Sequence, residues 1–451
     1  MTTRVPPVAS AGADAEPSRR HVLWLGFPGY GHVKATFGMV EELVRRGHRV
    51  TYVVADRFAE QAAGTGARVV TYTSVFPASI DPAETATTML LAFLRESFAP
   101  LETTLAAVAG DPPHLVVHDV LASETATAVS RLHGVPTVRT YAGFGSNEHV
   151  PQNGTEHDPA RAPVDLADVR LRDLGEELTA RVTAAGVADL FAAGPPGGDE
   201  AAASISFVVR EFQIRGETFG DDYLFAGPCL RAADFAGAWS PPPGSPPLLL
   251  VSLGTSANRR PGFFRQCAEA FAGTPWHVVM TLGGGVDPAS LGPLPPNVEA
   301  HAWVPHLAVL EHADAFVCQG GTGSLMEAFH QGVPVVVVPQ QQDQWAIAQQ
   351  VADLGLGLSV RPDELDGRTL SAAVEAVAAD AGVRRRVAEL SVRVRAAPGA
   401  GAVADRLEAV MAEAAEAAEA AETAEAAARP TGVAGPEDVP AGGAGQVPEP
   451  A

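Results

Sequence analysis

A histidine and an aspartate stand where a sheet-based fold would bring them together. His32 ends the glycine-rich stretch LGFPGYGH, between an apolar run at residues 21–27 and a helix-like run at residues 33–47. Asp119 ends a second apolar run, HLVVHD. Both runs have the pattern of buried parallel strands, and such sheets bind ligands at their carboxyl edge. An imidazole backed by a carboxylate can take a proton from a substrate hydroxyl there.

The place of His32 at a helix start also predicts its protonation state. The positive end of the helix disfavours an imidazolium, so the ring is expected to be neutral. Plainer interpretations stay open: His32 as a polar residue without chemistry, and Asp119 as a helix cap, alone or in addition. The glycines follow G-x-x-G-x-G, the wrong order for a dinucleotide site, which weakens an NAD alternative based on Asp56.

Two further glycine turns could hold phosphate. QGGTGS, residues 319–324, follows an apolar run, and its backbone N–H groups would open a helix. It is not a Walker motif, because no Lys-Ser/Thr pair follows. SLGTS presents Gly254, Thr255 and Ser256 to the same cleft. A tight strand-to-helix turn without a ligand is the alternative.

The side chains around these turns suit a nucleotide and a sugar. Trp303 in HAWVP could stack a base, and Glu327, about a turn into the helix, could take ribose hydroxyls. Asp343 and Gln344 in PQQQDQWA supply the acceptors and donors that sugar hydroxyls need. The alternatives are core packing for Trp303, a solvated face for Glu327 and a helix cap for Asp343.

Strands alternating with helices must position these groups, and they predict two doubly wound α/β units in tandem. We expect a disordered tail at residues 1–20, an N-terminal acceptor-binding domain at 21–228 and a linker rich in Pro and Gly at 229–247. A C-terminal nucleotide-sugar domain at 248–400, a helix at 401–427 that packs back on the first domain, and a disordered tail at 428–451 follow. Residues 145–199 are expected to form an irregular or helical insertion.

Composition and net charge limit the classes of partner that the chain is expected to bind. The chain has 451 residues, and its formal net charge of −22 opposes nucleic acids and anionic membranes. A Glu-rich segment, residues 413–430, carries part of that charge. The three cysteines, Cys229, Cys267 and Cys318, show no paired spacing, which argues against disulfides and a cysteine zinc site. We read no signal peptide and no membrane span, and expect a cytoplasmic monomer or homodimer.

Together the motifs resemble the macrolide glycosyltransferases. FPGYGHV, VHD, VSLGTS and the run from WVPHLAVL to VPQQQDQ agree with that family over residues 21–425. The family belongs to the GT-B class, in glycosyltransferase family 1, related to the UDP-glucuronosyltransferases. The resemblance implies two Rossmann-like domains facing a central cleft. It also implies inverting transfer of a sugar from a nucleotide diphosphate, with no metal and no further cofactor.

The resemblance assigns a role to each site residue. His32 would be the general base, and Asp119 would orient it. Nucleotide binding falls to Trp303, Val304, Glu327, Gln319, Gly321, Thr322, Gly323, Ser324 and Thr255, and donor-sugar binding to Asp343 and Gln344.

The acceptor would be a macrolide or another apolar natural product. The stretch Met89–Phe98 is rich in Leu and Phe, so Leu90, Phe93 and Phe98 are expected to line an apolar pocket. Plain core packing is an equal alternative for this stretch.

Three positions depart from the family pattern. Gln319 stands where the family has a His that contacts the diphosphate, His306 stands where it often has Gln, and Lys34 in GHVKAT replaces the Asn of GHVNPT. Gln319 motivates the alternative of a weakened auxiliary or binding homologue, and a sugar-nucleotide 2-epimerase is another. Glu327 favours UDP-glucose as the donor because it suits a ribose diol, with a dTDP-deoxysugar as the alternative. Lys34 has no assigned role.

Overall fold

The computed structural model describes residues 19–77, 85–151, 164–188, 201–244, 246–256, 258–340 and 342–428. The chain forms two compact units, divided between Met411 and Ala412. The first unit contains two β-sheets, as the alternation of strands and helices predicted. Apart from residues 19, 20 and 428, the predicted tails lie outside the described residues, as does part of the predicted insertion.

The first sheet has seven strands in the order β3-β2-β1-β4-β5-β6-β7, and its pairings are parallel. Its strands are β1 (His21–Leu25), β2 (Arg49–Ala55), β3 (Arg68–Tyr72), β4 (Leu115–Asp119), β5 (Thr137–Tyr141), β6 (Ala203–Ser206) and β7 (Tyr223–Phe225). Leu25, the last residue of β1, pairs with His118 of β4. The turn after β1 and the carboxylate of Asp119 therefore lie at the same edge of the sheet.

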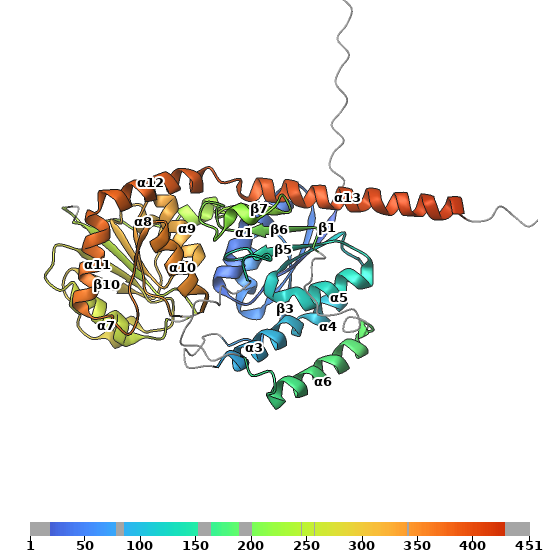
Figure 1. Ribbon diagram of the computed structural model, residues 1–451, viewed down its shortest axis with the longest axis horizontal. Helices are drawn as coiled ribbons and strands as arrows, with labels where there is room; N and C mark the ends of the chain where they lie inside the picture. Colours follow the sequence, from blue (N-terminus) through green and yellow to red (C-terminus); the bar gives the residue numbers. More distant parts are fainter. Residues whose placement is uncertain are drawn as a thin grey trace, which may run out of the picture. The chain divides into compact units, whose positions relative to one another are not determined.

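Helices flank this sheet (Figure 1). They are α1 (Tyr30–Arg45), α2 (Ala59–Ala63), α3 (Ala86–Phe98), α4 (Leu101–Val108) and α5 (Ser123–His133). A further helix, α6 (Val169–Ala184), packs against α3. Helix α1 buries Val33, Phe37, Val40 and Leu43, which recur at helical spacing. It ends just before Gly47, whose φ of +88° stops a helix at little cost.

The second sheet has six strands in the order β10-β9-β8-β11-β12-β13, also paired in parallel. Its strands are β8 (Leu248–Ser252), β9 (His277–Thr281), β10 (Val298–His301), β11 (Ala315–Cys318), β12 (Val335–Val337) and β13 (Gly357–Ser359). The helices that follow them are α7 (Pro261–Ala270), α8 (His306–Leu310), α9 (Thr322–Gln331), α10 (Gln342–Asp353), α11 (Gly367–Ala379) and α12 (Ala381–Arg395).

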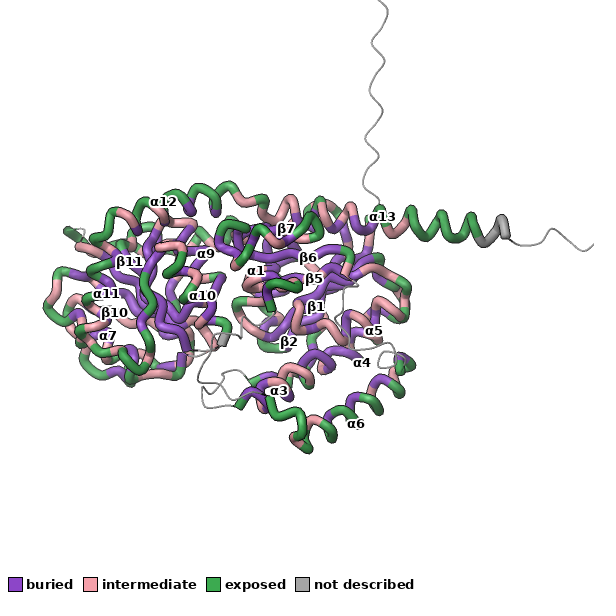
Figure 2. The backbone as a smooth tube through the Cα atoms, in the orientation of Figure 1, coloured by how far each residue is buried: buried purple, intermediate pink, exposed green. Residues whose placement is uncertain are grey.

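Both faces of the second sheet are covered. Along β8, Leu248 and Leu250 belong to one core cluster, whereas Leu249 and Val251 belong to another. Successive strand residues point to opposite faces, so two clusters on one strand mean two buried faces. Figure 2 shows the central strands of both sheets as buried, whereas the edge strands β3 and β13 are partly exposed.

The last helix, α13 (Gly399–Ala428), belongs in its first turns to the core of the first sheet. Val403, Leu407 and Met411 share a cluster with residues of β1 and α1. Arg46 donates to Asp405 (2.6 Å) and Glu408 (2.9 Å), which adds ion pairs beside this apolar contact. Beyond Met411 the helix is largely exposed. Among the described residues, no helix combines the length and apolar character that a membrane crossing requires.

We expect Leu407→Ala to lower the free energy of unfolding by about 2–5 kcal/mol, because it opens a cavity in a fully buried position of this cluster. Urea unfolding measures the change. Glu413→Ala, at an exposed position two turns along, is the matched control and should change stability by less than about 0.5 kcal/mol. Equal effects of the two substitutions would contradict the packing of α13 in this core.

Candidate functional site

His32 and Asp119 are in direct contact. His32 Nδ1 lies 2.7 Å from Asp119 Oδ2, and the aspartate side chain is almost fully buried. Asp119 Oδ1 accepts a second hydrogen bond from the Leu121 backbone N–H (2.9 Å). Asp119 therefore fills both roles that the sequence left open: it caps the helical turn after β4 and it holds the imidazole.

Glycine at position 29 makes room for the histidine ring. Gly29 is the N-cap of α1, and a Cβ there would lie 2.9 Å from His32 Cδ2. Nδ1 carries the proton when it donates to Asp119, which leaves Nε2 as the basic nitrogen. No group among the described residues pairs with Nε2, so it is available to a substrate hydroxyl.

The pKa of His32 is raised above its ordinary value of 6.5. Burial lowers the pKa by penalising the charged ring, but the charge of Asp119, its hydrogen bond and the charge of Asp343 together outweigh burial. The sequence predicted the opposite direction from the helix end alone, and in that respect it was wrong. A higher pKa makes the neutral ring a stronger proton acceptor. The fraction of His32 in the neutral form increases as the pH rises.

An aromatic cluster lies beside the histidine. The ring centroids of Phe27 and His32 are 5.2 Å apart, and Phe27 also contacts Phe76 (4.9 Å) and Phe93 (5.8 Å). Met89 belongs to the same cluster. This arrangement places apolar side chains beside the His32 ring, of which Phe27, Phe76 and Met89 are buried and Phe93 is partly exposed.

The buried carboxylate of Glu96 holds the loop that carries Phe76. Glu96 Oε2 accepts from the backbone N–H groups of Val75 (2.8 Å) and Phe76 (2.7 Å), and Oε1 accepts from the Tyr72 hydroxyl (2.7 Å). Sequence analysis missed Phe27 and Phe76. Phe27 lies inside the FPGYGH motif and could have been noticed, whereas Phe76 comes from a loop without a pattern.

The structure places the three residues that were predicted to bind the acceptor in different environments. Phe93 lies in the aromatic cluster, and Leu90 is half-buried on the same helix. Phe98 is only 2% exposed and packs in a different cluster, formed by α3, α5 and α6. The structure thus gives Phe98 a core role, the alternative that the sequence had left open, because it lies at the far end of α3.

The two phosphate-type turns are adjacent at one sheet edge. Ser252 at the end of β8 pairs with Cys318 at the end of β11, so the turns that follow lie side by side. Gly320 has a φ of +95°, and a Cβ there would lie 2.9 Å from Val337 Cγ1. The N-cap of α9, Gly321, supplies no side-chain hydrogen bond to the helix end. Backbone N–H groups at this helix start are therefore not occupied by a capping side chain.

Gln319 lies between these turns. Its side chain is buried, and its Oε1 has no hydrogen-bond partner in the described part of the chain. Its Nε2 is so close to Gly254 that a Cβ there would approach it to 2.6 Å. The remaining predicted phosphate residues lie on the same two turns, with Thr255 after β8 and Thr322, Gly323 and Ser324 in the first turn of α9.

Glu327 already has two side-chain partners. Its side chain is 7% exposed, Lys34 Nζ donates to Oε1, and His306 Nδ1 lies 3.3 Å from Oε2. Burial alone would raise the pKa of Glu327, but the charge of Lys34 and the contacts with His306 lower it to about 2. Glu327 therefore does not lie on a solvated face, and Lys34, which the sequence analysis left unassigned, has a partner.

Trp303 is exposed rather than part of a core. Its residue is 53% exposed, and its ring lies 5.1 Å from that of Tyr30 in an edge-on arrangement. Val304 beside it is buried in the core. An exposed indole at a strand end has a free face on which a base can stack.

Asp343 and Gln344 lie in the first turn of α10. Asp343 is exposed, and its charge acts on His32. Gln344 is buried and its Oε1 accepts from the Gln340 backbone N–H (2.8 Å), which ties α10 to the loop after β12. Of this pair, Asp343 is the residue whose charge acts on the histidine, and burial of its carboxyl raises its own pKa.

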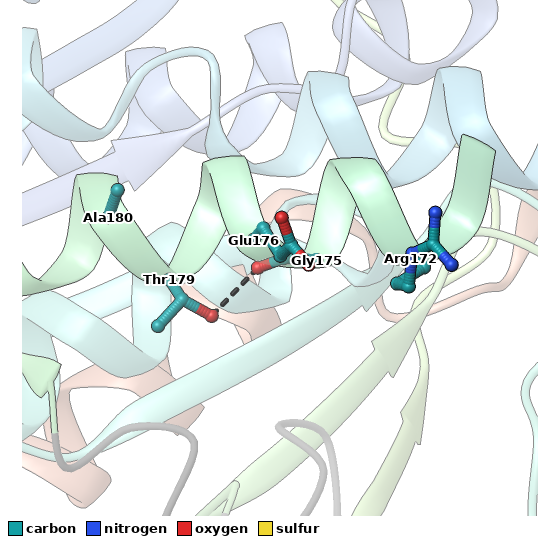
Figure 3. A pocket seen from close by; sticks show the side chains of 5 residues that line it. All are labelled: Arg172, Gly175, Glu176, Thr179 and Ala180. Atoms are coloured by element: carbon teal, nitrogen blue, oxygen red, sulfur yellow. Dashed lines mark hydrogen bonds between the residues drawn. The ribbon is translucent and has the colours of Figure 1, made fainter. Parts of the chain in front are cut away.

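A hollow on α6 lies outside the candidate site. Figure 3 shows a hollow lined by Arg172, Gly175, Glu176, Thr179 and Ala180, all from α6. Thr179 Oγ1 donates to the Gly175 carbonyl there (2.7 Å), and none of the five is a predicted site residue. Within the ranges that the structure describes, no three His, Cys, Asp or Glu side chains are grouped to hold a metal ion.

Comparison with known proteins agrees with this fold. Residues 273–410 match the family model described as erythromycin biosynthesis protein CIII-like, C-terminal domain. The chain is 36% identical over 406 residues to demethyllactenocin mycarosyltransferase of Streptomyces fradiae, covering 87% of each protein. It is 34% identical over 402 residues to oleandomycin glycosyltransferase of Streptomyces antibioticus, covering 86% of this chain and 90% of the relative.

Among solved structures, the calicheamicin glycosyltransferase CalG4 is 39% identical to this chain. The TM-score is 0.74, and the match covers 88% of this chain and 99% of CalG4. This similarity confirms the predicted GT-B fold of two Rossmann-like domains.

We expect Asp119→Asn to lower the pKa of His32, because the substitution removes the charge that stabilises the imidazolium and leaves burial as the larger effect. NMR titration of the imidazole measures it. Asp343→Asn should lower the pKa less, since its charge is the smallest of the three raising effects, and Asp363→Asn on the surface should not change it. An unchanged pKa in Asp119→Asn would contradict the coupling.

Proposed function

The chain belongs to the macrolide glycosyltransferases of glycosyltransferase family 1, and we propose from this that it transfers a sugar, with inversion, from a nucleoside diphosphate to a hydroxyl of an apolar natural product. The observation that carries the proposal is the His32–Asp119 pair, with Nε2 free beside an aromatic cluster. The names of its relatives favour a macrolide as the acceptor.

In the proposed step, an acceptor hydroxyl attacks the anomeric carbon from the face opposite the nucleotide. The hydroxyl proton goes to His32 Nε2, and Asp119 balances the charge that develops on the ring. The bond from the anomeric carbon to the diphosphate oxygen breaks, and its electron pair leaves with the diphosphate. Backbone N–H groups at the start of α9 stabilise that leaving charge.

The donor is proposed to lie along the second sheet edge. Trp303 stacks the base beside Val304, Glu327 binds the pentose, and Asp343 and Gln344 bind the sugar. The diphosphate lies among Thr255, Gln319, Gly321, Thr322, Gly323 and Ser324. The raised pKa of His32 supports this placement, because the charge of Asp343 contributes to it and so acts at the point of transfer.

In this proposal, each domain binds one of the two substrates. Residues 21–228 bind the acceptor through Leu90, Phe93 and the other members of the aromatic cluster. Residues 248–400 bind the nucleotide sugar. The first turns of α13 pack in the core of the first sheet, so they form part of the acceptor-binding domain in this proposal.

A second candidate is a homologue that binds nucleotide sugars but transfers them weakly. Gln319 favours it, because an amide cannot carry the positive charge of the family's histidine at the diphosphate. The contact between His32 and Asp119 favours catalysis, since a binding protein has no use for a base held at 2.7 Å by a buried carboxylate. The transfer assay below separates the two candidates.

We expect His32→Ala to lower kcat by about 10²–10⁴-fold, because it removes the imidazole proposed to take the proton. Product formation from a macrolide acceptor, with UDP-glucose and dTDP-glucose as donors, is measured by mass spectrometry. Calorimetry should find nucleotide binding unchanged, and His149→Ala, an exposed histidine, should keep full activity. Full activity in His32→Ala would exclude the base assignment, and nucleotide binding without any product in the wild type would favour the binding homologue.

Phe93→Ala should raise the KM for the acceptor roughly tenfold, because it removes the partly exposed aromatic ring from the cluster beside His32. The dissociation constant of the nucleotide should stay the same. Phe98→Leu, on the same helix but in a separate core, is the control that costs stability without changing this KM. Equal acceptor KM values for Phe93→Ala and the wild type would show that the cluster is plain core.

A further inference from the structure

Glu96 is a buried carboxylate that the proposed chemistry does not use. It lies in the last turn of α3 and is 1% exposed. Its Oε1 accepts a hydrogen bond from the Tyr72 hydroxyl (2.7 Å) at the end of β3. Its Oε2 accepts from Ser74 Oγ (3.1 Å) and from the backbone N–H groups of Val75 (2.8 Å) and Phe76 (2.7 Å). One carboxylate therefore bonds three successive residues of the loop after β3.

The loop depends on this carboxylate for its backbone donors. The Val75 N–H bonds to Glu96, and the Phe76 N–H also bonds to Ser74 Oγ (3.2 Å), which itself donates to Glu96. All the partners of the carboxyl group donate, which suits its ionised form, because that form only accepts. Hydrogen bonds to an ionised carboxylate are stronger than bonds between neutral groups, and a buried charge requires them. The carboxylate therefore fixes the backbone of the loop at Val75 and Phe76.

Arg57 bonds the same loop from its other side. Its Nη1 donates to the Phe76 carbonyl (3.5 Å), and its Nη2 donates to the Pro28 carbonyl. Pro28 lies in the turn that leads to His32. The backbone of Phe76 is therefore bonded through its N–H to Glu96 and through its carbonyl to Arg57. Since Arg57 also bonds the turn of the proposed base, the loop is linked to that turn.

The loop carries two apolar side chains that differ in exposure. Phe76 is buried, and its ring centroid lies 4.9 Å from that of Phe27 and 5.1 Å from that of Phe93. Val75 is 58% exposed, and Phe93 is partly exposed. An apolar ligand gains free energy by covering exposed apolar side chains, so Val75 and Phe93 are suited to contact an acceptor. Phe76 supports the ring of Phe93 from within the cluster.

We propose that Glu96 is a positioning residue for the acceptor: it fixes the loop of Val75 and Phe76, and thereby the apolar side chains that bind the acceptor beside His32, without touching a substrate. This inference rests on the proposed function, because it concerns the acceptor side of the same site. Such a residue governs how tightly the acceptor binds. The rate at which a bound acceptor loses its proton depends instead on His32 Nε2.

Glu96→Met in the full-length protein tests the proposal, because methionine has a similar length but offers no oxygen to the loop. We expect the KM for a macrolide acceptor to rise roughly tenfold, with kcat within about twofold of the wild-type value and the dissociation constant of the nucleotide unchanged. Glu96→Gln should keep this KM within about threefold of the wild-type value. Its amide oxygen can accept from the loop N–H groups, and its amide nitrogen can donate to the Tyr72 hydroxyl.

Glu124→Met is the matched control. Glu124 is a half-buried carboxylate near the start of α5 that accepts hydrogen bonds from the hydroxyls of Ser97 and Ser123 and has no bond to the loop after β3 among the described residues. Its substitution should lower stability without changing the acceptor KM. Glu96→Asp, whose shorter side chain does not reach the loop, replaces Glu96→Met if that variant does not fold.

A double-mutant cycle with Phe76→Ala shows whether Glu96 acts through the loop. In the Phe76→Ala background, Glu96→Met should raise the acceptor KM by less than about twofold, whereas two independent effects would multiply. Hydrogen exchange of the wild type provides a measurement without any substitution. The amide protons of Val75 and Phe76 should exchange at least about tenfold more slowly than unprotected amides.

Three results would each overturn the proposal: unprotected Val75 and Phe76 amides in the wild type, an acceptor KM that Glu96→Met leaves unchanged, and effects of Glu96→Met and Phe76→Ala that multiply. A fall in kcat of the same size in Glu96→Met and Glu124→Met, with no change in KM, would assign Glu96 to stability alone. Absence of sugar transfer by the wild type would instead overturn the proposed function and this inference with it.

Discussion

Parallel pairing of strands at a shared edge is the constraint on which the site depends. The pairing of β1 with β4 places the turn that ends in His32 next to Asp119, and the pairing of β8 with β11 places two glycine turns together. The turns after β1 and β11 lead into α1 and α9. The contact of His32 with Asp119 and the closeness of the two glycine turns therefore both follow from the strand register.

The site also contains two buried carboxylates. Asp119 and Glu327 are both almost fully buried, and each is stabilised by a cation or a potential cation from α1. His32 and Lys34 are two residues apart, and residues at this spacing point in different directions from a helix. One helix start thus serves two separate carboxylates. This geometry explains how two neighbouring residues of α1 engage carboxylates from β4 and α9.

The aromatic cluster shows how a polar network supports an apolar surface. Glu96 is buried in an apolar environment, but its oxygens accept hydrogen bonds from the Tyr72 hydroxyl and from the loop that carries Phe76. Because these bonds fix the loop, the ring of Phe76 stays against Phe27 and Phe93 beside the histidine. A polar residue in the last turn of α3 therefore helps to fix the position of the Phe76 ring.

The sequence by itself determined the two parallel sheets, the glycine turns and the identity of His32 and Asp119, because these depend on short-range patterns of burial and backbone conformation. Only the tertiary structure decided which side chains from distant parts of the chain contact these residues. It raised the pKa of His32 through Asp119, moved Phe98 into a separate core and joined Lys34 to Glu327, which are 293 residues apart. Contacts at such separations leave no periodicity in the chain, since the energy of an ion pair depends on the distance in space and not on the distance along the sequence.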